Sequence, residues 1–374
     1  MRVTAKFIAP FALLISAASG LNAQQLANWI IPAGGREYGA DAGDLFELIR
    51  FGKLMPDGDV IIADSRGLFV RVYSPNGART AAFGRKGGGP GEFVGISGLW
   101  LAADGRIGVW DGYSHRLSTF ERNGTLVATH NIKAPPSMPG SFEFLFGQLR
   151  NGDLLLGSLH MARRPQQGEL LAERWIRGRF SPQGEFRAPA GEMSGMIRAR
   201  MTPLPFTPVP RVALRGDSLW VAEGYDPQLK LVNAAGQVVR TVNLPWRVRG
   251  SDAMWTQLET SLQEQKKNLQ LEHIKLVPRE NQVPSVAGLL MDDRGFLWVK
   301  EYDPSNDSIW LKRGDAANIG PGGLWRIMNP AGAWIAQVRI PANLMPLDIV
   351  GNRLLGVARD DLDVEHVVVF TITR

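Results

Sequence analysis

The chain has 374 residues with 42 lysines and arginines against 36 aspartates and glutamates, a formal net charge of +6. This surplus is small, and the basic residues form no extended stripe with interleaved aromatics, so we expect no nucleic-acid partner. An acidic polysaccharide and a membrane surface are alternative partners that the charge does not exclude. The sequence contains no cysteine, which excludes disulfides, thiolate metal sites, cysteine nucleophiles and a lipid-modified N-terminal cysteine.

The N-terminus predicts a secretory signal peptide over residues 1–23. Arg2 and Lys6 precede an apolar run from Phe7 to Ala18, and small residues lead to a cleavage site near Ala23. The run is shorter than the ~20 apolar residues that span a bilayer, and no later stretch is long enough. We therefore predict a periplasmic or secreted protein without a transmembrane segment after signal removal. An uncleaved anchor is the alternative.

A tight turn followed by a short β-rich run recurs along the whole chain, and a second turn follows each of the first five runs. Each repeat thus supplies two hairpins, which make a four-stranded antiparallel meander. Such units bury both faces only when several close into a ring. The six turns and runs are Asp57-Gly58 with Val60 to Asp64, Asp104-Gly105 with Ile107 to Asp111, Asn151-Gly152 with Leu154 to Leu156, Arg215-Gly216 with Leu219 to Glu223, Arg294-Gly295 with Leu297 to Glu301, and Gly351-Asn352 with Leu354 to Val357.

The number of turns predicts an all-β fold, a six-bladed β-propeller in one domain over residues 24–374. The sixth repeat supplies only three strands, and the β-rich segment Leu26 to Ile31 has no turn partner. We predict that this segment completes the sixth blade, because an open ring would expose unpaired strand edges. Seven blades is the alternative, since Phe186 to Pro208 has room for a further pair of strands.

One segment, residues 251–276 between the fourth and fifth blades, departs from the strand pattern. Its apolar side chains recur at three- and four-residue spacing after Ser251 or Asp252, either of which can cap a helix. The pattern predicts an inserted amphipathic helix that packs on the rim of the propeller. A lid or a partner-docking element is the alternative. The apolar positions are Met254, Trp255, Leu258 and Leu262.

Two segments carry a family resemblance. They are Phe83 to Phe93, with its run of glycines, and Ile96 to Asp111, and both are similar to segments of NHL-repeat propellers of the secreted bacterial type. Ser114-His115-Arg116-Leu117 resembles the Asn-His-Arg-Ile/Leu signature of that repeat, with serine in place of asparagine. The match is good over residues 52–130, recognisable in the fourth and fifth repeats, and weak in the third and sixth. It implies a six-bladed ring that binds protein, polysaccharide or RNA, or in a minority acts as a lyase or hydrolase.

Several specific sites are excluded. The cluster Gly84 to Gly91 is not followed by Lys and Ser/Thr opening a helix, so it predicts a crossover between blades rather than a phosphate loop. The amidating-lyase branch of the fold holds zinc with histidines on its innermost strands. The corresponding segments, Ile96 to Leu99 and Val286 to Leu289, contain none. No Gly-x-Ser-x-Gly elbow, His-Glu-x-x-His helix or EF-hand loop is present.

Polar and mostly acidic residues stand where the second strand of each blade ends, next to the crossovers and around the mouth of the channel. Acids from several blades could converge on Ca²⁺ or another divalent cation, or act as general acid and base. Alternatively, each acid accepts backbone N–H bonds in its own turn. These residues are Asp64, Asp111, Ser158, Glu223, Glu301 and Arg359-Asp360, of which Asp64, Asp111, Glu223 and Glu301 are the metal candidates.

The predicted ligand-binding surface is this mouth, and no catalytic residue is assigned. The aromatics expected near it or its walls are Trp100, Trp110, Tyr113, Tyr225 and Tyr302. The excursion from His160 to Arg174 is either a specificity element or a solvated hairpin. The ligand-binding candidates are Asp64, Arg66, Arg85, Asp111, His115, Arg116, Glu223, Tyr225, Glu301, Tyr302 and Arg359.

Two functions fit these observations. The first is an exported, monomeric binding or scaffolding protein that recognises a protein, peptide or glycan through the channel mouth. The second is a metal-assisted lyase or hydrolase that uses the acids around the channel. Bound metal and chelator-sensitive melting would favour the second function.

Overall fold

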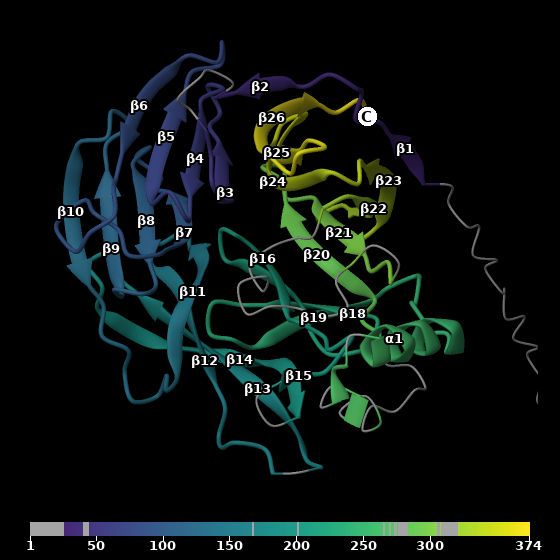
Figure 1. Cartoon of the computed structure of the whole chain (residues 1–374). Helices are drawn as coiled ribbons and strands as arrows, with labels where there is room; N and C mark the ends of the chain where they lie inside the picture. The colour runs from purple at the N-terminus through teal and green to yellow at the C-terminus, as the bar shows by residue number, and fades with distance from the viewer. Residues whose placement is uncertain are drawn as a thin grey trace, which may run out of the picture.

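In a computed structural model, the chain folds into six β-sheets arranged as blades around a common axis (Figure 1). The first strands of neighbouring blades contact one another and lie innermost. The structure describes residues 26–39, 45–166, 168–199, 202–264, 266–268, 271–272, 275, 283–304, 307 and 321–374.

Consecutive strands build each of the first four blades, as the alternating runs and glycine turns predict. The first blade contains β3 (Ile49–Leu54), β4 (Val60–Asp64), β5 (Phe69–Tyr73) and β6 (Arg79–Phe83). The second contains β7 (Ile96–Leu101), β8 (Ile107–Asp111), β9 (Arg116–Phe120) and β10 (Leu126–Asn131). The third contains β11 (Ser141–Gln148), β12 (Leu154–His160), β13 (Leu170–Phe180), β14 (Phe186–Ala199) and β15 (Thr202–Pro203). The fourth contains β16 (Arg211–Arg215), β17 (Ser218–Ala222), β18 (Gln228–Val232) and β19 (Val238–Asn243).

The last two blades combine strands from both ends of the chain. The fifth contains β20 (Val286–Met291), β21 (Leu297–Glu301), β22 (Gly323–Met328), β23 (Trp334–Ile340) and β1 (Ala27–Trp29). The sixth contains β24 (Leu344–Val350), β25 (Arg353–Arg359), β26 (Glu365–Thr371) and β2 (Arg36–Tyr38). The six-bladed prediction is confirmed. The seven-bladed alternative is wrong, because Phe186 to Pro208 supplies the outer strand β14 of the third blade and the short β15 that pairs with its end.

Closure by an N-terminal strand is confirmed, but the sixth blade is completed by a different segment from the one predicted. The strand β2 pairs antiparallel with β26, placing Glu37 opposite Val368. The segment Leu26 to Ile31 instead contains β1, which pairs parallel with β23 in the fifth blade. Ile30 then bridges to Thr373 near the end of the chain.

Aromatic packing explains why the two N-terminal strands occupy these positions. The ring of Trp29 on β1 lies edge-on to Trp298 of the fifth blade, with centroids 5.4 Å apart, and beneath the guanidinium of Arg374. The ring of Tyr38 on β2 packs edge-on against Tyr73 of the first blade at 6.1 Å. Each strand thus buries one aromatic side chain against a partner distant in sequence.

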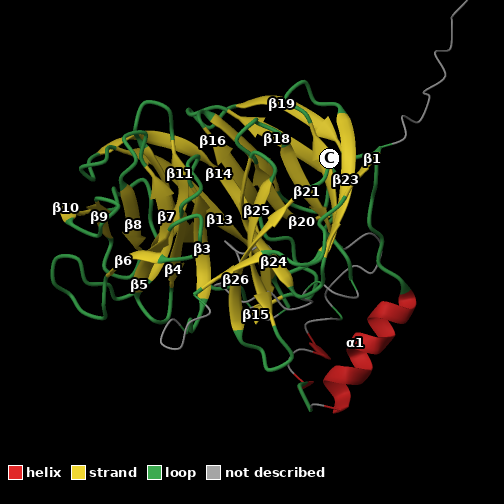
Figure 2. Ribbon diagram, turned by 90° about the horizontal axis from the view of Figure 1, so that it is seen from above, coloured by secondary structure: helices red, strands yellow, loops and turns green. Residues whose placement is uncertain are grey.

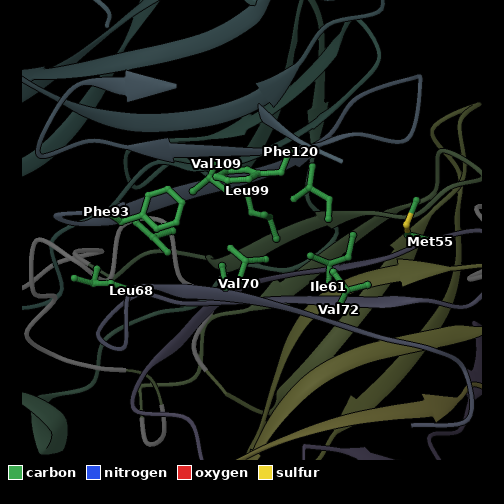
Figure 3. Packing of buried hydrophobic residues seen from close by; sticks show 12 residues of the cluster. Met55, Ile61, Leu68, Val70, Val72, Phe93, Leu99, Val109 and Phe120 are labelled. Atoms are coloured by element: carbon green, nitrogen blue, oxygen red, sulfur yellow. The ribbon is translucent and has the colours of Figure 1, made fainter. Parts of the chain in front are cut away.

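The hydrophobic core is divided among the spaces between neighbouring blades. Between the first two blades, Ile61 and Val70 pack with Leu99, Val109 and Phe120 in one continuous apolar cluster (Figure 3). Each blade therefore depends on the next to bury its apolar side chains, which is why the ring must close.

The inserted helix is confirmed as α1 (Asp252–Glu264), which lies on one face of the ring (Figure 2). The hydroxyl of Ser251 accepts a hydrogen bond from the Met254 N–H at 3.2 Å, a typical N-cap. The helix is shorter than the predicted 251–276, because Lys266 adopts a φ of 54°, the left-handed conformation that ends helices. Some residues of the predicted C-terminal part lie outside the described residues.

The predicted signal peptide, residues 1–23, lies outside the described residues. Within the described part of the chain, no helix is both long and apolar enough to cross a membrane.

Candidate functional site

One face of the ring collects the ends of the second strands and the starts of the first strands. The pairing register places Asp64 opposite Ile49 in the first blade and Asp111 opposite Ile96 in the second. We call this the mouth face. The helix α1 packs on it through contacts with the fifth blade, where Tyr302 follows the second strand.

Asp64 is fully buried, and its carboxylate accepts four backbone hydrogen bonds. Two come from the segment that enters β3, the N–H groups of Glu47 at 2.6 Å and Leu48 at 3.2 Å. Two come from the turn after β4, the N–H groups of Arg66 at 2.9 Å and Gly67 at 2.7 Å. The carboxylate thereby joins the first-strand entry to the neighbouring hairpin of the same blade.

Asp111 repeats this arrangement in the second blade. Its carboxylate accepts hydrogen bonds from the N–H groups of Val94 at 2.6 Å, Tyr113 at 3.1 Å and Ser114 at 3.0 Å. A carboxylate has about four acceptor positions. The backbone occupies most or all of those on Asp64 and Asp111, which matches the alternative in which each acid caps its own turn.

The equivalent acids of the fourth and fifth blades each bind a basic side chain. Glu223 accepts hydrogen bonds from the Ser194 N–H at 2.7 Å and from the Lys230 ammonium at 2.8 Å. Glu301 forms an ion pair with Arg326 at 3.2 Å. The four metal candidates thus each have partners in their own or an adjacent blade. Among the described residues, no group of three or more histidine, aspartate or glutamate side chains is placed to hold a metal ion.

The sixth blade uses a residue that the sequence pattern did not identify. Arg359, at the end of the second strand, pairs with Asp363 at 2.7 Å and with Glu365 at 2.5 Å. The buried Glu365 also accepts the Ile49 N–H at 2.6 Å, so it supports the entry to the first blade. Glu365 begins the third strand rather than ending the second, which is why counting second-strand ends missed it.

The glycine-rich crossover between the first two blades is held internally. Arg116 is buried and donates through Nη1 to the Gly88 carbonyl at 2.6 Å and through Nη2 to the Glu92 carbonyl. The Glu92 carboxylate accepts the Gly89 N–H at 2.8 Å and pairs with Arg85 at 2.8 Å. These contacts give Arg85 and Arg116 a structural role in this loop.

Two of the predicted mouth aromatics, Trp100 and Trp110, lie between blades. His115 stacks on Trp110 with 8° between the ring planes and lies edge-on to Phe142. The Trp110 indole donates to the Glu143 carbonyl at 3.0 Å, and Trp100 is buried in the same interblade cluster. These side chains therefore contribute to packing.

Tyr113 differs from them, because it is 78% exposed. Its ring lies over Gly95, where an added Cβ would come within 2.1 Å of a ring carbon. Leu45 and Val94 are also exposed at the entries to the first and second blades. Together with the exposed Arg66 and Lys86, these residues form what we call the open patch: Leu45, Arg66, Lys86, Val94 and Tyr113.

Another part of the mouth face lies against α1, whose apolar cluster includes Ala199 of the third blade and Ala287 of the fifth. Trp255 and Leu258 of the helix pack in one cluster with Phe206 and Tyr302. The neighbouring Lys300 ammonium is buried, paired with the Asp307 carboxylate, and bound to a backbone carbonyl at 3.0 Å. Burial lowers the pKa of Lys300, while Asp307 opposes that shift.

No protein-family model and no curated protein sequence matches this chain. Solved structures share its fold. A member of the DUF4221 family from Bacteroides vulgatus aligns with a TM-score of 0.56 at 11% identity, covering 94% of this chain and 99% of that one. A catalytically inactive virginiamycin B lyase from Staphylococcus aureus aligns with a TM-score of 0.43 at 13% identity, covering 90% of this chain and 88% of that one. The calcium-binding protein regucalcin from Agrobacterium tumefaciens aligns with a TM-score of 0.47 at 12% identity, covering 93% of this chain and 96% of that one.

At such low identities, the likeness to the DUF4221 member concerns the propeller fold alone. With TM-scores below 0.5, the other two say nothing further about this chain. Function has to be argued from the mouth face itself.

Proposed function

We propose that this protein is an exported binding propeller of the NHL-repeat type that recognises a partner protein through the open patch. In this proposal the signal peptide is cleaved near Ala23, and the mature monomer acts outside the cytoplasm. The recognised element is an acidic, partly apolar segment of the partner.

The hydrogen bonds that the carboxylates of Asp64 and Asp111 accept are the main support for this proposal. Both carboxylates hold backbone N–H groups, including those of Arg66, Val94 and Tyr113. The acids thus position the loops that carry the open patch instead of meeting a substrate. An exposed aromatic on a rigidly held loop is typical of protein recognition. A metal-assisted lyase or hydrolase would require these carboxylates to be available for the metal or the reaction.

Charge favours an acidic partner. Arg66 and Lys86 are exposed, and neither forms an ion pair within the described parts of the chain. Glu47 is exposed on the loop that enters β3, so the positive surplus is modest and apolar contact has to supply part of the affinity. Complementary charges at such a rim raise association rates and select partners.

An array of 15-residue peptides that combine Asp or Glu with Leu, Phe or Tyr tests the proposal, with Lys-for-Glu versions as the control set. We expect the acidic set to bind and binding to weaken with added salt. The variants Tyr113→Ala and Arg66→Glu should each weaken binding about 10-fold, roughly 1.4 kcal/mol. The control variants Val239→Ala and Arg187→Glu alter exposed residues of the outer strands β19 and β14 and should bind like the wild type.

Equal binding of both peptide sets, or wild-type binding by both patch variants, would contradict the proposal. Binding confined to neutral glycans would mean that the partner is a glycan and not a protein. A chelator-sensitive melting temperature in the purified protein would favour the metal-dependent alternative instead.

A further inference from the structure

Within the described residues, two buried hydroxyl groups without a hydrogen-bond partner lie on the side of the mouth face where α1 packs. They are the hydroxyls of Tyr225 and Tyr302. Tyr302 is 5% exposed and Trp255 1% exposed, and both belong to the apolar cluster that contains Phe206. Tyr225 lies close enough to Tyr302 to affect its ionisation electrostatically.

Such a concentration of unpaired donors needs an explanation. A buried donor that loses its partner costs about 1–3 kcal/mol, and native proteins contain few of them. The two hydroxyls come from separate parts of the chain, the loop after β17 and the residue after β21. An acceptor that reaches both hydroxyls would satisfy them together.

The surroundings indicate the chemistry of that acceptor. Burial raises the pKa of both tyrosines, so their hydroxyls stay protonated and act as donors at neutral pH. At Tyr302, the carboxylates of Asp307 and Asp303 add to this rise of the pKa, and the guanidinium of Arg211 opposes it. Lys300 precedes Tyr302 by two residues. Asp307 is paired with the Lys300 ammonium, so the two carboxylates near Tyr302 are matched by the two cations Lys300 and Arg211. The two unpaired hydroxyls then select for an acceptor oxygen.

Aromatic rings surround these donors. Phe206 and Trp255 pack edge to face with centroids 5.0 Å apart, and Tyr302 contributes a third ring to the same cluster. A flat apolar body suits these rings, as it does in most small-molecule sites, where a few polar groups fix the orientation of a largely apolar ligand.

We propose that the region bounded by Tyr225, Tyr302 and Trp255 binds a small aromatic carboxylate. The carboxylate accepts hydrogen bonds from the two tyrosine hydroxyls, and the ring packs against Phe206 and Trp255. Because Tyr302 is almost fully covered, α1 must move aside to admit the ligand and then close over it. The proposal is independent of the open patch and of its protein partner.

The first test uses the ligand-free protein. Tyr225→Phe and Tyr302→Phe each remove an unpaired hydroxyl and keep the ring, so the melting temperature should stay the same or rise by a few degrees. The matched control is Tyr38→Phe, whose hydroxyl donates to the Pro75 carbonyl at 3.4 Å, and this change should lower it. A drop in melting temperature for both site variants would show that their hydroxyls are already paired, for example by buried water, and would overturn the proposal.

The second test uses benzoate, phenylacetate and indole-3-acetate as probes, with phenylacetamide and benzylamine as neutral and cationic controls. At least one carboxylate should raise the melting temperature and change the tryptophan fluorescence. Each Tyr→Phe variant should weaken its binding about 10-fold, and the double variant should abolish it. Arg66→Glu should leave it unchanged, which separates this site from the open patch. Absence of any carboxylate effect, equal binding of benzylamine, or wild-type affinity in the double variant would each refute the site.

Discussion

At the scale of single residues, His366 links three segments of the ring closure. Its Nδ1 lies 2.5 Å from a Glu37 carboxylate oxygen on β2, and its Nε2 lies 3.1 Å from an Asp360 oxygen in the hairpin after β25. The hydrogen bond to Asp360, followed by that to Glu37, raises the pKa of His366 above its ordinary value of 6.5. The protonated imidazole therefore stabilises the attachment of β2 to the sixth blade.

This contact predicts a pH dependence of stability. A raised pKa in the folded state means that the contribution is fully present below about pH 6.5 and is lost as the pH rises through the folded-state pKa. We expect the urea midpoint of the wild type to fall over that range more than the midpoint of His366→Gln. The effect should be small because all three side chains are partly exposed. Parallel curves for the two proteins between pH 5.5 and 8.5 would show that His366 does not contribute.

At the scale of one element, α1 is bound to the propeller by a single apolar stripe. Trp255, Leu258 and Leu262 are buried, whereas the residues between them face solvent or are only partly covered. Most of the stability of a helix of this length comes from such packing rather than from intrinsic propensity. The stripe reaches Ala287 on the innermost strand β20, so the helix and the ring share one apolar cluster.

We therefore expect Leu258→Ala to lower the free energy of unfolding by about 2–4 kcal/mol, through lost burial and the cavity left behind. The neighbouring Gln257 is exposed, and Gln257→Ala should change it by no more than about 0.5 kcal/mol. Denaturant unfolding monitored by circular dichroism measures both. An unchanged main transition in Leu258→Ala, with only a separate loss of helix signal, would mean that α1 unfolds independently of the ring.

At the scale of the whole molecule, the N-terminal strands determine whether the ring is closed. The strand β2 covers the outer edge of β26 and packs Tyr38 against the first blade, while β1 only widens a fifth blade that already has four strands. The two strands should therefore differ in importance, since an uncovered strand edge invites pairing with other molecules.

Three chains that start at residues 26, 33 and 40 test this difference. The chain from 33 lacks β1 and the contacts of Trp29, so it should melt several degrees lower than the chain from 26 but stay monomeric. The chain from 40 also lacks β2, and we expect it to aggregate or to lose cooperative unfolding. Size-exclusion chromatography and thermal melting decide this. If the chain from 40 were as monomeric and stable as the chain from 33, ring closure by β2 would be dispensable.

Local features of the sequence were enough to predict the class of fold. The turn glycines and alternating runs defined six repeats, and Ser251 or Asp252 marked the start of the inserted helix. These signals are local, because strand alternation and turn conformation depend on a few neighbouring residues. The same signals correctly indicated that the N-terminus must complete the ring.

Only the tertiary structure decided which N-terminal strand joins which blade and what each mouth acid binds. Asp64 looked like a candidate metal ligand in the sequence, but four N–H groups surround it in the fold. Glu365 contacts Ile49 across 316 positions, and the hydroxyls of Tyr225 and Tyr302, which come from different blades, are both buried. Such partners are brought together by ring closure and by packing between blades, which act over distances in the chain that local patterns do not encode.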